Sequence, residues 1–171
     1  MRTFQKLTAK LSSWSMWAVS FLILPLAIVV VYTVIMRYFW AKAPVWGFEV
    51  PIFLYGIFFM VAGAEGLRLK VHVTVDVFPR MLNEKGKQVL EAVSSLVIII
   101  VCLVLTYHGY NMALDSTLIN EHSTHQSTFN PPIWWFKWFI PISAFLILLQ
   151  AISELISTIY RFLGKESKND A

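Results

Sequence analysis

Few residues in this sequence could do chemistry, and the histidines are the first to consider. The four are His72, His108, His122 and His125. A His-x-x-His pair with Glu121 beside it could ligate a metal, but the spacing is short and no further ligand set accompanies it. The single cysteine, Cys102, excludes an internal disulfide, a Cys-x-x-Cys redox centre and a cysteine-rich metal site. We therefore expect a polar loop around His122, and no metal or cofactor bound by this chain.

Local signatures of catalysis are also missing from the sequence. It contains no P-loop, no Gly-x-Ser-x-Gly nucleophile elbow and no His-Glu-x-x-His zinc motif. Ser, His and Asp residues occur without a pattern that selects a catalytic triad. The sequence therefore predicts a protein that is not an enzyme.

Two pairs of opposite charges flank long apolar segments. Glu65 and Arg68 are three residues apart, a spacing at which helical side chains meet. Arg37 and Glu49 lie at the facing ends of two neighbouring apolar segments. We expect each pair to neutralise itself at a membrane interface, because isolated charges are costly there. Contact with a partner protein or an ion path is the alternative for both pairs.

The composition indicates a membrane protein. Of the 171 residues, 57% are hydrophobic and 14% are charged, against about 25% charged residues in soluble domains. This balance excludes a disordered chain and an ordinary cytosolic enzyme. A net charge of +4 would suggest nucleic acid in a soluble protein, but here the basic residues are topology signals and no nucleic-acid partner is expected.

Four apolar segments are long enough to cross a membrane, since a spanning helix needs about 20 apolar residues. The expected spans are residues 14–37, 46–67, 91–114 and 134–160. The first apolar run is too long for a cleaved signal peptide and is expected to remain as an anchor. We predict an all-α integral membrane four-helix protein that forms a single transmembrane domain over residues 1–171.

The aromatic and basic residues near the span ends support this map. All seven tryptophans fall at predicted span ends or in the adjoining loops, as an aromatic belt requires. Between spans two and three we expect a segment that lies in the membrane interface, with a plain cytoplasmic connection as the alternative. The residues expected to contact lipid at the interfaces are Trp14, Trp17, Arg80, Lys85, Lys87, Trp134, Trp135 and Trp138.

The distribution of lysine and arginine sets the orientation. Eleven of them lie in the N-terminal tail, the middle loop and the C-terminal tail, whereas only Arg37, Lys42 and Lys137 lie on the other side. Cytoplasmic loops carry the excess of basic residues. We therefore expect both termini and the middle loop in the cytoplasm, and the first and third loops outside.

The order of motifs resembles the small permease subunit, the DctQ-like family, of tripartite ATP-independent periplasmic (TRAP) transporters. Arg37-Tyr38 follows span one, and Pro44-x-Trp46-x-x-Glu49 opens span two. Gly63-Ala64 and Leu67-Arg68 close span two, before His72-Val73-x-Val75-Asp76. The segment from Trp134 to Pro141 opens span four in the same way. The resemblance covers nearly the whole chain.

This resemblance implies a subunit of the bacterial inner membrane without a site of its own. A large permease subunit would carry the substrate and sodium sites, and a periplasmic binding protein would deliver an acidic solute such as a C4-dicarboxylate or sialic acid. The small subunit would act as a scaffold and offer its outer face to that binding protein. Asp115, Glu121 and Lys137 are the candidate docking residues, unless the third loop is only a solvated connector.

A membrane anchor of a redox complex is the alternative function. It would need histidines within two facing spans to hold a haem. Only His108 lies within a predicted span, near its outer end.

Overall fold

The structure is a computed structural model of the chain, and it describes residues 2–69, 83–124 and 128–162. The described residues form helices and loops without a β-strand, apart from one isolated antiparallel bridge between His122 and Pro132. The predicted all-helical class is therefore confirmed. The helices are α1 (Arg2–Ser20), α2 (Ile23–Trp40), α3 (Glu49–Arg68), α5 (Glu84–Leu118), α6 (Trp134–Lys137) and α7 (Phe139–Phe162).

Four helical segments are long and apolar enough to cross a membrane, as predicted. They are Gln5–Trp40, Glu49–Arg68, Gly86–Leu118 and Trp134–Arg161. The third is longer than expected, because α5 begins at Glu84. The second half of the predicted interfacial segment is thus the first part of a spanning helix. Residues 70–82, with Arg80, lie outside the described residues.

The first spanning segment is divided, which corrects the prediction of one continuous helix over residues 14–37. Helix α1 ends at Ser20, α2 begins at Ile23, and a turn at Phe21–Leu22 separates them. Pro25 explains the break, because it has no N–H to donate to the carbonyl of Phe21 and its ring clashes with that carbonyl. Helix α2 contains no buried residue, so its surface is free to face lipid or another protein.

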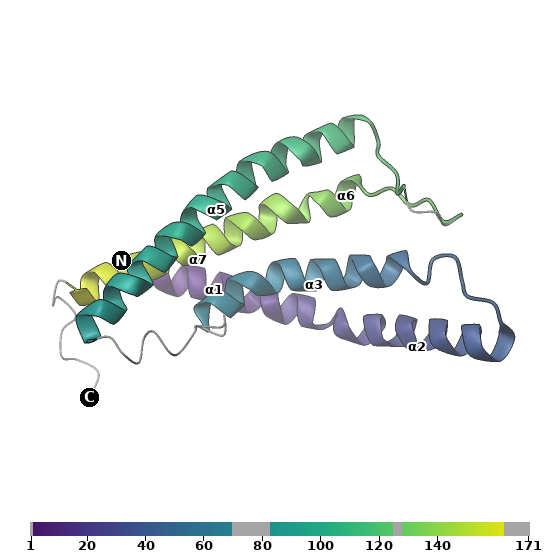
Figure 1. The fold of residues 1–171 in the computed structure, drawn as a ribbon, viewed down its shortest axis with the longest axis horizontal. Coiled ribbons are helices and arrows are strands. Elements are labelled where there is room, and N and C mark those ends of the chain that lie inside the picture. The colour runs from purple at the N-terminus through teal and green to yellow at the C-terminus, as the bar shows by residue number, and fades with distance from the viewer. Residues whose placement is uncertain (1, 70–82, 125–127, 163–171) are drawn as a thin grey trace.

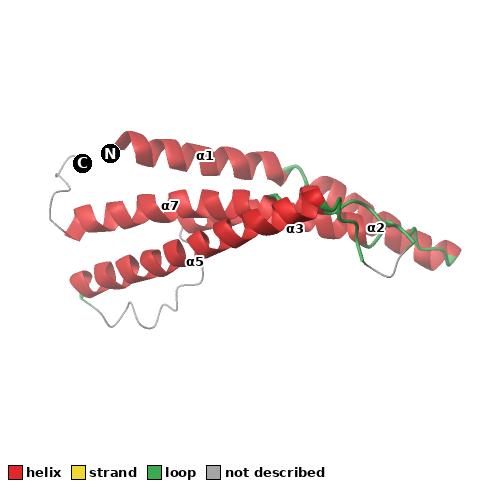
Figure 2. Cartoon of the chain, turned by 90° about the horizontal axis from the view of Figure 1, so that it is seen from above, coloured by secondary structure: helices red, strands yellow, loops and turns green. Residues whose placement is uncertain are grey.

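The helices run along one long axis and pack as two hairpins with α1 beside them (Figure 1). Helix α5 packs most extensively against α7, and α3 packs against α1, α2 and α7. Figure 2 shows α1, α7 and α5 running side by side toward the end at which α1 begins and α7 finishes. We call this end the termini end, and the opposite end, with residues 41–48 and 119–133, the loop end.

Small side chains allow the helices to approach closely. Ala64, Ala113, Ala144 and Ala151 are all buried. Lipid tails are as apolar as leucine, so helices in a membrane associate through close packing rather than through a hydrophobic drive. Gly109, four residues before Ala113 on α5, also lies in a helix contact, since a Cβ at residue 109 would come 3.1 Å from Ile140 Cγ2.

Enlarging Gly109 is expected to destabilise the contact between α5 and α7. Gly109→Leu should lower the free energy of unfolding by about 1–3 kcal/mol, because the added atoms meet Ile140 and the backbone of Pro141. Thermal unfolding in mild detergent measures the loss. Val104→Leu adds one methylene on the same helix at a position that is 52% exposed, and should leave the midpoint unchanged. Equal midpoints for both variants would contradict the contact.

Candidate functional site at the two ends of the bundle

Glu65 and Arg68 form a bidentate ion pair near the end of α3. Arg68 Nε donates to Glu65 Oε2 at 2.8 Å, and Arg68 Nη2 donates to Glu65 Oε1 at 2.6 Å. Ser13 Oγ in α1 donates to the same carboxylate at 3.2 Å. The Glu65 side chain is 9% exposed and that of Arg68 is 33% exposed. The pair expected from the spacing is therefore formed, and it also joins α1 to α3.

Glu49 at the loop end has a different partner from the one predicted. It is buried in the first turn of α3, where the helix dipole favours an anion, and its Oε1 accepts a hydrogen bond from Ser123 Oγ at 2.9 Å. Arg37 lies exposed in the last turn of α2, and among the described residues no ion pair joins it to Glu49. Glu49 therefore fastens the third loop to α3 instead of neutralising Arg37.

The two sides of the third loop run antiparallel and are joined by backbone hydrogen bonds. Ser123 N donates to Pro131 O at 2.9 Å, and Ile133 N donates to Glu121 O at 2.9 Å. Lys137 Nζ forms an ion pair with Glu121. The hydrogen bond from Lys137 holds the pKa of Glu121 below its usual value. Glu121 therefore keeps its charge, and the ion pair persists, to a lower pH than for a glutamate without such a partner.

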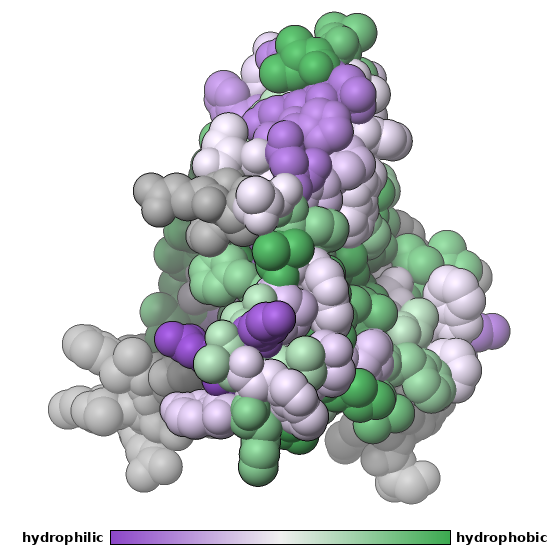
Figure 3. Space-filling model, turned by 90° about the vertical axis from the view of Figure 1, so that its right-hand side faces the viewer, coloured by the Kyte–Doolittle hydropathy of each residue, from purple (hydrophilic) through white to green (hydrophobic). Residues whose placement is uncertain are grey.

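The three predicted docking residues thus differ in their surroundings. Glu121 and Lys137 bind each other, whereas Asp115 is exposed in the last turn of α5. Figure 3 looks onto the loop end and shows hydrophilic residues gathered in its upper part, with apolar residues around them. This surface offers a charged and polar patch to a soluble partner.

The tryptophans predicted to meet lipid fall into two groups. Trp14 and Trp17 on α1 are 66% and 63% exposed. Trp135 and Trp138 instead contact protein: the Trp135 ring meets Phe53 edge-on, and Trp138 Nε1 donates to Thr117 Oγ1 at 3.1 Å. Trp134 is half-buried at the start of α6.

Among the predicted basic lipid contacts, Lys87 is half-buried on α5. Lys85 lies in the first turn of the same helix, and only its backbone is described.

Among the described residues, the candidate chemical groups lie apart from one another. Within residues 2–69, 83–124 and 128–162, no three His, Cys, Asp or Glu side chains are grouped to hold a metal ion. His122 Nδ1 lies 3.0 Å from Asn130 O, His125 lies outside the described residues, and His108 is exposed on α5. The described groups can pair helices and present charge.

Sequence reasoning missed one ion pair between helices. Arg161 Nη2 on α7 lies 2.9 Å from Glu91 Oε2 on α5, near the termini end. Seventy residues separate the two positions, so no local spacing could indicate the pair. The only available signal was that each is a charged residue at the cytoplasmic limit of a predicted span.

Comparison with family models identifies the architecture. The family described as "Tripartite ATP-independent periplasmic transporters, DctQ component" matches residues 26–161. The match covers most of α2 and all or most of the later helices. Comparison with curated proteins finds no match.

The Glu65–Arg68 pair should show strong coupling in a double-mutant cycle. Arg68→Leu leaves the Glu65 carboxylate, which is 9% exposed, with the hydrogen bond from Ser13 but without its ion pair, and should lower the free energy of unfolding by about 3 kcal/mol. Glu65→Leu/Arg68→Leu removes both charges and should cost less than the sum of the single variants. Unfolding midpoints in detergent measure all three proteins. If the loss in the double variant equals the sum of the losses in the two single variants, the interaction between Glu65 and Arg68 contributes nothing to stability.

Proposed function

The chain belongs to the DctQ component family of tripartite ATP-independent periplasmic transporters, and from this premise we propose how it serves transport. It is a small membrane subunit of such a transporter. In the proposal it acts as a scaffold for the large permease subunit and forms part of the docking face for a periplasmic binding protein. The transporter takes up an acidic organic solute, of the C4-dicarboxylate or sialic acid class, driven by sodium.

The scaffold role is supported mainly by the placement of the charges. Acidic and basic residues are confined to the ends of the spanning helices, and the middle of each span is free of them. A coupling site in a transporter needs acidic groups near the midplane, or broken helices whose free backbone groups line a cavity. The break between α1 and α2 carries no acidic group, and α2 buries none of its residues. The substrate and sodium sites are therefore assigned to the large subunit. No observation favours the alternative of a redox-complex anchor.

The docking role is supported by the loop end. Docking sites for soluble partners are polar at the rim, and charge steers the encounter. Asp115 is exposed there, and the ion pair of Glu121 with Lys137 holds the loop in shape. We assign this end to the periplasm and the termini end to the cytoplasm of a bacterial inner membrane, because of the basic excess in the segments joined to the termini end.

The orientation predicts the activity of reporter fusions. A reporter active only in the periplasm should be silent after Ala171 and active when inserted in the third loop near Ser123. Enzyme activity in whole cells measures both fusions, and immunoblots control for their amounts. The opposite pattern would overturn the orientation.

Docking predicts that charge reversal at the loop end raises the apparent KM for solute delivered by the binding protein. Asp115→Lys should raise this KM several-fold and make uptake less sensitive to salt, because charge steers the encounter between the binding protein and the membrane complex. The swap Glu121→Lys/Lys137→Glu keeps the ion pair but reverses its polarity, and should raise KM as well.

A matched control tests whether the position of the reversed charge matters. Lys10→Glu reverses an exposed charge at the termini end and should leave KM unchanged. Unchanged kinetics for both loop-end variants, at constant membrane levels of the complex, would remove the docking role.

The scaffold role predicts that the large subunit cannot work alone. Cells that make the large permease subunit and the binding protein without this chain should show no uptake of radiolabelled solute. Immunoblots of membranes should show that the large subunit is still inserted. Full uptake in these cells would refute an essential role for the small subunit.

A further inference from the structure

One face of α5 carries a line of exposed side chains at coiled-coil spacing. Val97, Val101, Val104, His108 and Asn111 follow one another in alternate steps of four and three residues, which places them along one side of the helix. All five are exposed. We call these five residues the α5 seam.

The α5 seam faces away from the rest of the described structure. Cys102, Gly109 and Ala113 are buried, and Gly109 lies against Ile140 and Pro141 of α7. With 3.6 residues per turn, these three buried positions lie on the side of α5 opposite to the seam. The seam is therefore open to lipid or to another protein.

The two polar members of the seam lie at the depth of the lipid tails. Glu91 and Asp115 flank 23 residues of α5 that include no Asp, Glu, Lys or Arg. At 1.5 Å per residue this stretch is about 35 Å long, only about 5 Å more than the hydrocarbon thickness. His108 is about 10 Å deeper than Asp115, and Asn111 is about 6 Å deeper. Both belong to the outer third of the span Gly86–Leu118.

The hydrogen-bonding groups of His108 and Asn111 lack partners at this depth. Within the described part of the chain neither side chain forms a hydrogen bond, and the described contact of the His108 ring is with the ring of Tyr107. An Asn amide offers two donors and an acceptor, and a neutral imidazole offers one of each. Lipid tails can satisfy none of these groups. The two side chains are also too short to reach the headgroups as those of Lys and Arg do.

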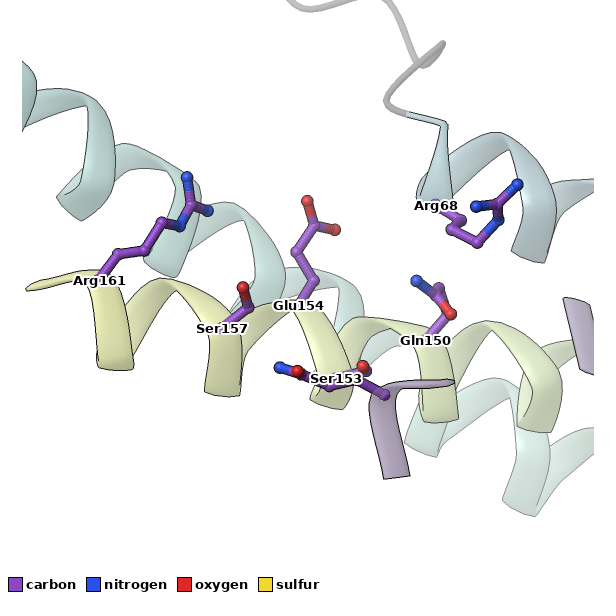
Figure 4. A pocket seen from close by; sticks show the side chains of 7 residues that line it. Arg68, Gln150, Ser153, Glu154, Ser157 and Arg161 are labelled. Atoms are coloured by element: carbon purple, nitrogen blue, oxygen red, sulfur yellow. The ribbon is translucent and has the colours of Figure 1, made fainter. Parts of the chain in front are cut away.

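The buried polar groups at the termini end are in a different situation. Figure 4 shows the pocket there, which has a volume of about 220 Å³ and is lined in part by Arg68, Gln150 and Arg161. Arg68 pairs with Glu65, and Arg161 pairs with Glu91. The pocket is polar and wide enough for several water molecules, which can satisfy Gln150. No partner protein is needed at that end, whereas the α5 seam needs one.

We propose that the α5 seam packs against a transmembrane helix of the large permease subunit. Hydroxyl, amide or backbone groups of that helix complete the hydrogen bonds of His108 and Asn111, while the three valines supply close packing. Both kinds of contact hold helices together in membranes. The inference rests on the proposed scaffold role and adds to it the face through which this chain binds the large subunit.

The charge of Asp115 argues against a second copy of this chain as the occupant. Asp115 continues the line of the α5 seam by the next step of four residues and is exposed. Two copies have the same orientation in the membrane, and in a symmetric pair the same surface of each copy forms the contact. Two Asp115 carboxylates would then be opposed, and like charges across an interface are unfavourable. A different chain without an acidic residue at this level avoids that repulsion.

Photo-cross-linking in membranes tests the face of contact. Benzoylphenylalanine is placed at Val101 in the α5 seam, or at Ile28 on the exposed surface of α2 as a matched control. The cells also make the large permease subunit and the binding protein. We expect illumination to join this chain to the large subunit from Val101 and not from Ile28, with the products identified by mass spectrometry.

Two variants test the hydrogen bonds of the seam. His108→Leu and Asn111→Leu should each weaken association with the large subunit about threefold, the effect of one average interhelical hydrogen bond. Förster transfer between labelled subunits in liposomes measures the association. The unfolding midpoint of the chain alone should not change, because neither group has a described partner within the chain. Tyr55→Phe removes an exposed hydroxyl from α3 and should leave the association unchanged.

The outcomes separate the seam from the scaffold role. If the two subunits co-purify but Val101 gives no product with the large subunit, the seam is wrong and the scaffold role stands. Products that join two copies of this chain from Val101 would show that a second copy occupies the seam. Unchanged association in both leucine variants would overturn the hydrogen-bonding role of His108 and Asn111. Failure of the wild-type chain to co-purify with the large subunit would instead contradict the scaffold role, and the seam with it.

Discussion

The hydrocarbon of a bilayer cannot hydrogen-bond a peptide group, and the rest of this structure depends on that constraint. Every spanning segment must satisfy its own backbone, which makes each one a helix. The same solvent removes the hydrophobic drive between helices, so contacts require close packing. The buried core therefore consists largely of small residues such as Ala64, Ala113 and Ala151, and Gly109 lies against Pro141. Large apolar side chains are left for the surface.

The same constraint confines charge to the two ends and makes its pairing consequential. Glu65 binds Arg68 and Ser13 at the termini end, and Glu49 binds Ser123 at the loop end. Each carboxylate joins segments that are distant in the sequence: α1 with α3, and α3 with the third loop. The ends thus hold the helices in register, while close packing holds their middles.

Hydropathy and local spacing were sufficient to predict the helices and one charge pair. The apolar runs gave four spans, and the three-residue spacing gave Glu65–Arg68, because both depend on neighbours along one helix. The Arg37–Glu49 pair was expected because the two residues lie at the ends of neighbouring spans, but the described contact of Glu49 is with Ser123, 74 residues along the chain, which no local spacing indicates. The Glu91–Arg161 pair also depends on how α5 and α7 pack, which no local pattern encodes.

The polar contacts of this subunit lie at its two ends, and the middle of each span is apolar. Substrate and ion sites within a membrane are built from polar groups near the midplane, or from the free backbone groups of broken helices that line a cavity. The break in the first span brings no charged group with it, because the residues from Ile23 to Met36 are all apolar or hydroxyl-bearing, and α2 buries none of them. The charged group that is exposed to a soluble partner at the loop end is Asp115. The apolar sides between the two ends are left to pack against lipid or against the large subunit, and this is the arrangement that the proposed scaffold role requires.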